Sequence, residues 1–157
     1  MEKIITLEHA RAIAKQLRTQ GKRIVLVGGC FDILHEGHLI FLQLAKAQGD
    51  VLFVAVENDE KVQKLKGSPR PVNSQEKRTK ILAGLDLVDY IIILPTFQTD
   101  EEYLRFTQML SPHVIAITQG DPKTAEKDKQ AQLVGGKVVA VTKRIEQYST
   151  TNALDQK

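Results

Sequence analysis

Short apolar runs alternate with helix-like segments along almost the whole chain, and this alternation limits the folds that are open to it. Each run is about five residues long and consists mainly of Val, Ile, Leu and Ala without polar alternation, which is typical of strands buried on both faces. The runs span residues 23–27, 51–56, 90–94, 114–118 and 137–141. They predict one α/β domain over residues 1–157, with a doubly wound parallel sheet of five strands and helices on both faces.

The segments between the runs have the spacing and the end signals of helices. Apolar residues recur at helical spacing from Leu7 to Leu17, and residues 41–48, 57–65 and 100–110 predict further helices, with a weaker one before the last strand. Asn73 and Glu76 have the spacing of an N-cap and its partner, and the helix that follows should face inward with Ile81, Leu82 and Leu85. Rossmann-like sheets of this kind bind ligands beyond the carboxyl ends of their strands.

Charge and composition narrow the classes of partner. The net charge of +3 is too small and too scattered to predict nucleic acid as a partner, although it suits a site for polyphosphate. The single cysteine, Cys30, excludes an internal disulfide. The first residues lack a signal peptide, and no apolar run reaches the roughly 20 residues that a bilayer requires. We therefore expect a cytoplasmic protein without a membrane partner.

The most informative segment follows the first strand and reads Gly28-Gly29-Cys30-Phe31-Asp32-Ile33-Leu34-His35-Glu36-Gly37-His38. The paired glycines allow a ligand to approach the backbone, and exposed N–H groups at a helix start favour an anion. His35 and His38 are three residues apart, so they project on the same side of a helical turn. Two imidazoles beside a triphosphate could donate hydrogen bonds as negative charge develops on its oxygens. Gly37, between the two histidines, would leave one wall of such a triphosphate site open.

Other interpretations of this segment remain open at this point. It lacks the glycine spacing of a dinucleotide-binding turn, the Gly-Lys-Ser/Thr of a P-loop, and the His-Glu-x-x-His of a zinc protease. A zinc site built from His35, His38 and Cys30 is conceivable, but no second cysteine supports it. Histidines near a turn are also often structural or exposed.

Two further segments carry positive charge or hydroxyl groups. The loop from Lys64 to Val72 is either solvated or a mobile lid over phosphates. Arg78, one turn before Ile81, could reach the cleft with a bidentate fork for phosphate or lie on the surface. Near the C-terminus, Ser149 or Thr150 could cap a helix whose N–H groups bind phosphate, although a plain cap would look the same.

These segments together resemble the HxGH nucleotidyltransferase superfamily. The resemblance rests on Gly29-Cys30-Phe31-Asp32 with His35-Glu36-Gly37-His38, and on Ser149-Thr150-Thr151. It implies that the histidines stabilise the transition state, that the acceptor phosphate attacks the α-phosphorus directly, and that Mg²⁺ neutralises the departing pyrophosphate. Leu65-Lys66-Gly67 and Arg70-Pro71-Val72-Asn73 resemble the heptose-phosphate adenylyltransferase domain. Glycerol-phosphate cytidylyltransferases also carry a basic loop, followed by an arginine that matches Arg78.

The resemblance also implies a set of site residues. The implied catalytic residues are His35, His38, Lys66 and Arg78. The implied nucleotide-binding residues are Gly29, Cys30, Phe31, Asp32, His35, Gly37, His38, Gly120, Asp121, Arg144, Ser149, Thr150 and Thr151. Mg²⁺ would be carried by the nucleotide phosphates rather than by a metal site of the chain, and relatives of this kind are commonly homodimers.

Three functions follow as expectations. The first is transfer of AMP from ATP to a sugar or polyol phosphate, with release of pyrophosphate. The second is CTP-dependent cytidylyl transfer to a polyol or amino-alcohol phosphate, which would use the same catalytic residues. The third is a nucleotide-binding regulatory module without turnover.

Overall fold

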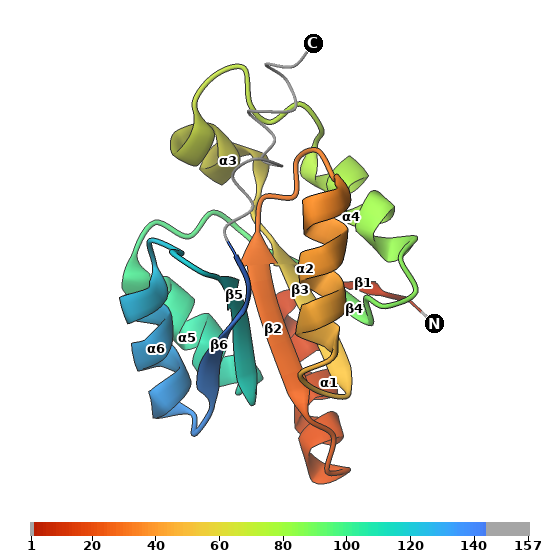
Figure 1. Ribbon diagram of the computed structural model, residues 1–157, viewed down its shortest axis with the longest axis vertical. Coiled ribbons are helices and arrows are strands. Elements are labelled where there is room, and N and C mark those ends of the chain that lie inside the picture. Colours follow the sequence, from red (N-terminus) through yellow and green to blue (C-terminus); the bar gives the residue numbers. More distant parts are fainter. Residues whose placement is uncertain (1, 144–157) are drawn as a thin grey trace.

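The computed structural model describes residues 2–143, which form a six-stranded sheet between two layers of helices (Figure 1). The strands are β1 (Ile4–Ile5), β2 (Ile24–Gly29), β3 (Val51–Val56), β4 (Tyr90–Ile93), β5 (Val114–Thr118) and β6 (Lys137–Thr142). The helices are α1 (Leu7–Thr19), α2 (Glu36–Lys46), α3 (Asp59–Lys66), α4 (Gln75–Ala83), α5 (Asp100–Leu110) and α6 (Thr124–Leu133).

All neighbouring strands in the sheet are parallel, in the order β1-β4-β3-β2-β5-β6. From β2 the chain runs outward through β3 to β4 and then crosses back to place β5 on the other side of β2. The direction of winding therefore reverses between β2 and β5. In such sheets the crevice beyond this reversal point is where ligands bind.

The predicted number of strands was wrong by one. The five predicted strands are all present, but β1 adds a sixth by pairing Ile4 with Ile91 and Ile5 with Ile92 of β4. A strand of two residues is too short to show a periodic pattern, and it is recognisable only through its partner. The parallel α/β class and the helices on both faces are confirmed.

Alternate side chains of the strands divide the core into two layers. Val25 and Val27 face α2 and α4, where they pack with Phe41, Leu42 and Leu82. Ile24 and Leu26 point the opposite way, toward α1 and α5, and pack with residues that include Ala10, Ala14, Phe106 and Leu110. This arrangement buries residues 24–27 of β2 and 52–56 of β3, which explains why these strands read as continuous apolar runs.

The start and the inward face of α4 differ from the prediction. Ser74 rather than Asn73 is the N-cap, since its side chain accepts a hydrogen bond from the N–H of Lys77. Ile81 was expected to face inward but is 43% exposed, whereas Leu82 is buried. The reason is that Arg78 and Thr79 are also buried, which turns the helix so that Ile81 lies outside.

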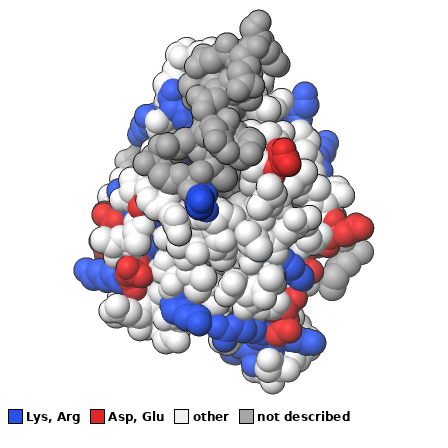
Figure 2. All heavy atoms as spheres, in the orientation of Figure 1, with Lys and Arg blue, Asp and Glu red and all other residues white. Residues whose placement is uncertain are grey.

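The face of the molecule shown in Figure 2 carries charges of both signs. In Figure 2 the Lys and Arg side chains of the described residues lie interspersed with Asp and Glu side chains around a largely uncharged centre. None of the helices between residues 2 and 143 combines the length and apolar character that a membrane span requires.

Candidate active site

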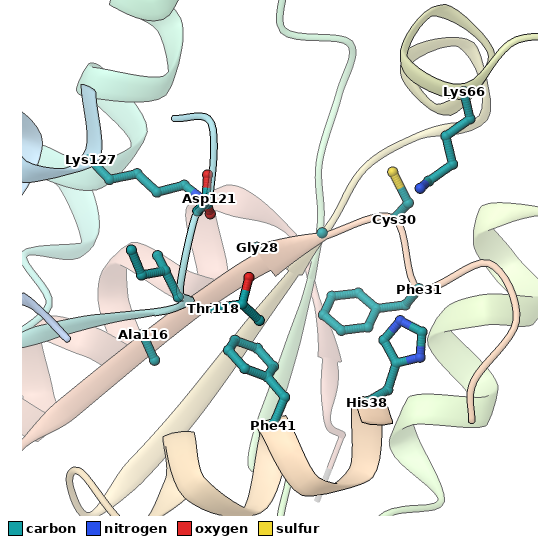
Figure 3. Close-up of a pocket in the computed structure, with 12 residues that line it drawn as sticks. Gly28, Cys30, Phe31, His38, Phe41, Lys66, Ala116, Thr118, Asp121 and Lys127 are labelled. Atoms are coloured by element: carbon teal, nitrogen blue, oxygen red, sulfur yellow. The ribbon is translucent and has the colours of Figure 1, made fainter. Parts of the chain in front are cut away.

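Two cavities meet at the carboxyl end of β2. The first has a volume of about 190 Å³ and lies beyond β2 and β5, at the reversal point of the sheet (Figure 3). Its wall begins with the segment from Gly28 to Phe31. It is completed by side chains from α2, α3, α6, the end of β5 and the turn after β5, which include His38, Phe41, Lys66, Thr118, Asp121 and Lys127. The sequence motif therefore lies where this fold class binds ligands.

The two predicted histidines lie together at the start of α2. His35 is the N-cap of the helix, and its Nδ1 accepts a hydrogen bond of 3.2 Å from the N–H of Gly37. The His38 ring stands beside it, with the two ring centroids 4.1 Å apart, and the Phe31 ring also packs against His38, with a centroid distance of 5.8 Å. The local order of the chain thus brings the two imidazoles together, and the His38 side chain lines the crevice.

Burial favours the neutral form of both imidazoles. The pKa of His38 falls to about 4 because burial penalises its charged form, with smaller contributions from His35 and the Lys66 ammonium. Burial also lowers the pKa of His35. Because Nδ1 of His35 accepts a hydrogen bond, its proton in the neutral form is assigned to Nε2. Among residues 2–143, no atom hydrogen-bonds the buried Nδ1 of His38.

Gly28 and Gly29 have different roles. A Cβ atom on Gly29 would lie 2.9 Å from Cε2 of Phe31, so Gly29 makes room for that ring. Phe31 itself has a φ of 50°, which is unusual for a bulky residue. A Cβ atom on Gly28 would meet nothing closer than a carbonyl oxygen at 3.9 Å. Of these two glycines, only Gly28 therefore leaves space beside the backbone for a ligand, as the sequence analysis expected of both.

Asp32 was expected to contact the nucleotide, but the structure gives it another role. Its carboxylate is 1% exposed and accepts hydrogen bonds from Nε of Arg70 and from the N–H groups of Val72 and Asn73, at 2.8–3.0 Å. Burial alone would raise the pKa of Asp32, but these hydrogen bonds and the Arg70 charge lower it. Asp32 therefore fastens the loop before α4 to the end of β2.

The same contacts revise the interpretation of the basic loop. Arg70 is 6% exposed and paired with Asp32, so this end of the loop is anchored rather than solvated. Lys66, which was expected in the loop, is the last residue of α3 and points into the first cavity beside Cys30 (Figure 3). Lys66 is thus the cation of the predicted middle motif that lines the crevice.

Arg78 was expected to reach the cleft, and this is corrected by the structure. Its side chain is fully buried, and Nη1 donates to the carbonyl oxygens of Cys30 and Glu57 at 2.7 and 2.8 Å. Nε donates to the carbonyl oxygen of Asn73, and Nη2 pairs with Asp59 at 2.7 Å. With its three nitrogens engaged in this way, Arg78 joins the ends of β2 and β3 instead of facing a substrate.

The turn after β5 supplies the opposite wall. Gly120 has a positive φ of 77°, and Asp121 follows it with its carboxylate 2.7 Å from Nζ of Lys127 on α6. Figure 3 shows this pair across the cavity from His38. Sequence reasoning missed Lys127, Thr118 and Phe41, because helix α6 has a weak pattern and an inward Phe on α2 reads as core.

Cys30 lies between the two cavities. Burial raises the pKa of its thiol, an effect that the Lys66 and Arg78 charges partly oppose. Within residues 2–143, no three His, Cys, Asp or Glu side chains gather as a candidate metal site, so the arrangement does not support a zinc site at Cys30. Four predicted site residues lie outside the described residues, namely Arg144, Ser149, Thr150 and Thr151.

The second cavity was not foreseen from the sequence. It measures about 380 Å³, shares Gly28, Gly29, Cys30 and Lys127 with the first, and extends between α3, α5 and α6. Within it, the hydroxyl of Tyr103 donates a 2.7 Å hydrogen bond to Oε2 of Glu57. These two residues are 46 positions apart, and no local pattern links them.

The chain is similar in sequence to a known protein family and to several curated proteins. Residues 26–154 match a family model described as cytidylyltransferase-like. The bifunctional protein HldE of Wolinella succinogenes is 41% identical over 145 residues, which are 92% of this chain and 28% of that protein. HldE of Geotalea uraniireducens is 38% identical over 98% of this chain and 31% of its own length. The chain thus spans about three tenths of the curated relatives it matches.

Two solved structures share the architecture. The lipopolysaccharide core biosynthesis protein of Thermoplasma volcanium superposes with a TM-score of 0.64 at 26% identity, over 79% of this chain and 99% of that one. Pantoate-beta-alanine ligase of Francisella tularensis gives a TM-score of 0.66 over 92% and 68% of the two chains. Its 17% identity limits that likeness to the fold.

Proposed function

The chain belongs to the cytidylyltransferase-like family, and from this premise we propose that it is a nucleotidyltransferase that moves AMP from ATP to a sugar or polyol phosphate and releases pyrophosphate. The observation that carries the proposal is that His38 lines the crevice at the reversal point of the sheet, with the His35 ring packed against it at 4.1 Å. A neutral imidazole still carries one N–H group, which can donate a hydrogen bond to a phosphate oxygen.

The proposed reaction is a direct displacement. An oxygen of the acceptor phosphate forms a bond to the α-phosphorus of ATP, while the bond from that phosphorus to the β-phosphate oxygen breaks. The electron pair leaves with pyrophosphate, and no covalent bond to the protein forms. Since the attacking phosphate is already anionic near neutral pH, the protein contributes positioning and charge stabilisation rather than proton removal.

The described residues have distinct proposed roles in this step. His35 and His38 donate hydrogen bonds to phosphate oxygens on which charge builds up, beside the N–H groups at the start of α2. Lys66 lines the same cavity and compensates negative charge from its other side. Asp32 and Arg78 hold the walls in place through their buried hydrogen bonds. Arg144, Ser149, Thr150 and Thr151 are proposed, from the sequence motif, to bind the distal phosphates.

We expect Mg²⁺ to enter with the triphosphate. Asp121 is a carboxylate in the wall of the first cavity, and it is already paired with Lys127. A cation held mainly by phosphate oxygens and water fits this donor set, because Mg²⁺ keeps several waters and needs few protein ligands. When bound, it would neutralise charge on the departing pyrophosphate.

ATP is preferred over CTP on the strength of the segment from Leu65 to Asn73, which resembles adenylyltransferases. The decisive experiment measures pyrophosphate release from ATP and from CTP with a panel of sugar, polyol and amino-alcohol phosphates. Release from ATP with a sugar or polyol phosphate supports the proposal. Release only from CTP would favour the cytidylyltransferase, and tight nucleotide binding without release would favour a regulatory module.

We also propose that the chain forms a homodimer, as expected from its relatives. Sedimentation equilibrium of the purified chain at several concentrations tests this directly. A mass equal to one chain at every concentration would contradict it.

A further inference from the structure

Lys127 lies at the junction of the two cavities. Among residues 2–143, both cavities are lined only by Lys127 and by the segment from Gly28 to Cys30. Lys127 reaches this junction from the first turns of α6, and its Nζ atom donates a 2.7 Å hydrogen bond to Oδ2 of Asp121. The lysine side chain is 27% exposed, so a ligand in either cavity can approach its ammonium group.

Asp121 is held in place by contacts that do not involve Lys127. Its other carboxylate oxygen, Oδ1, accepts a 2.7 Å hydrogen bond from the N–H of Lys123, and its carbonyl oxygen accepts one of 2.6 Å from the hydroxyl of Thr124. These contacts fix the turn before α6. Lys127, by contrast, has a flexible four-carbon stem and three N–H donors, so it is the member of the pair that can change its partner.

The first cavity has few cations for ligands that carry several phosphates. Within the part of the chain that the structure describes, Lys66 and Lys127 are the only Lys or Arg side chains in its lining. They enter from opposite sides of the end of β2, Lys66 from α3 and Lys127 from α6 (Figure 3). Because Asp121 compensates the charge of Lys127, the α6 side of the cavity offers this cation in full only when the pair opens.

Opening the pair between Lys127 and Asp121 costs little free energy. The two side chains are 27% and 16% exposed, and ion pairs that water can reach contribute little to stability. A hydrogen bond from an ammonium group to a phosphoryl oxygen is charge-assisted, like the bond to a carboxylate that it replaces. A phosphoryl group also carries more negative charge than one carboxylate. Exchange of Asp121 for a phosphoryl group at the junction is therefore favourable.

We propose that Lys127 binds a phosphoryl group at the junction of the two cavities, and that it leaves Asp121 to do so. Its ammonium group then faces Lys66 across the bound phosphates, so that cations from α6 and α3 hold them from both sides. This rests on the proposed function for the reaction itself, to which it adds a substrate-contacting residue. The chemistry that Lys127 recognises is a phosphoryl oxygen, which either the nucleoside triphosphate or the phosphorylated acceptor can supply.

Direct binding tests the proposal without relying on turnover. The probes are inorganic pyrophosphate and glycerol 3-phosphate, each titrated calorimetrically into the purified chain without divalent cations. Lys127→Met should weaken binding of at least one probe by about tenfold, the scale of one hydrogen bond between charged groups, and Lys127→Arg should recover most of the affinity. An effect on pyrophosphate alone assigns the contact to the nucleotide, and an effect on glycerol 3-phosphate alone assigns it to the acceptor.

Asp121→Asn distinguishes a phosphate contact from a purely structural ion pair. Without the competing carboxylate charge, the affected probe should bind about threefold more tightly, whereas a structural pair predicts weaker binding in both variants. The control is Lys129→Met, an exposed lysine of α6 that lines neither cavity. Thermal midpoints show whether each variant is folded. Failure of the parent to bind either probe would overturn the proposal, as would unchanged binding in Lys127→Met or equal weakening by Lys127→Met and Asp121→Asn.

Turnover separates this proposal from the proposed function. Weaker probe binding in Lys127→Met, together with no pyrophosphate release by the parent from any nucleotide and acceptor, would refute the proposed function and retain the phosphoryl contact. Release by the parent, with kcat and KM both unchanged in Lys127→Met, would refute the contact and retain nucleotidyl transfer.

Discussion

The guanidinium of Arg78 donates a 2.7 Å hydrogen bond to the carbonyl oxygen of Cys30, 48 residues earlier in the chain. The same nitrogen holds the carbonyl oxygen of Glu57, so a single buried side chain joins the strand ends that form the wall between the two cavities. The site therefore depends on a cation that is inaccessible to solvent. This arrangement makes Arg78 a positioning residue.

Removing this cation should destabilise the fold as well as the site. Arg78→Ala leaves buried carbonyl oxygens without donors, and we expect a loss of about 3 kcal/mol in the free energy of unfolding. Urea denaturation measures it, with Arg105→Ala on the exposed face of α5 as the control. If Arg78→Ala kept its stability but lost catalysis, Arg78 would instead act by contacting the substrate.

Asp32 and Arg70 form a buried ion pair in which each partner depends on the other. Asp32→Asn leaves the Arg70 charge buried and unpaired, which should lower the free energy of unfolding by about 3–5 kcal/mol. Asp86→Asn, at an exposed position, is the matched control. Chemical denaturation of the three proteins decides the point, and a loss no greater than that of Asp86→Asn would show that the pair contributes nothing.

These two corrections show what the sequence could and could not predict. The strands were found because each apolar run is a local signal, and the histidines were found because they lie three residues apart before one helix. Lys66 was expected in a loop, but it is the last residue of α3, one residue beyond the predicted helix. The strand β1, with two residues, has no local pattern of its own.

The roles of Asp32 and Arg78 depend on partners far along the chain. Asp32 meets Arg70 across 38 residues, and Arg78 meets Cys30 across 48. In a sequence, a charged residue beside a motif is easily taken for a ligand-binding residue. Whether it is buried depends on the packing of the whole domain, which the sequence does not show. The cavity at Glu57 and Tyr103 escaped detection for the same reason.

His38 should act mainly in the transition state. If its ring donates to oxygens that gain charge during displacement, His38→Ala should lower kcat by roughly 10²–10³ while the KM for nucleotide changes little. The control is His9→Ala, an exposed histidine on α1. Steady-state kinetics with each substrate varied in turn would show a rise in KM alone if His38 served only in binding.

The low pKa of His38 predicts how stability varies with pH. The folded chain keeps His38 neutral down to about pH 4, whereas the unfolded chain titrates it near its ordinary value of 6.5. Between these values the unfolded state binds more protons, so stability should fall as the pH is lowered from 6.5 toward 4. Thermal midpoints of the parent and of His38→Asn across this range test it, and parallel curves would refute the shift.

The paired glycines at the end of β2 offer the sharpest steric comparison. Gly29→Ala places a methyl group 2.9 Å from the Phe31 ring, which must move, and Phe31 packs against His38. We expect a loss of about 1–3 kcal/mol and reduced kcat. Gly28→Ala meets nothing closer than 3.9 Å and should keep the parent's stability, while its methyl group enters the wall shared by both cavities and raises KM. Equal stability of the two variants in urea would show that Phe31 does not need the space above Gly29, and that its contact with His38 is not held by this packing.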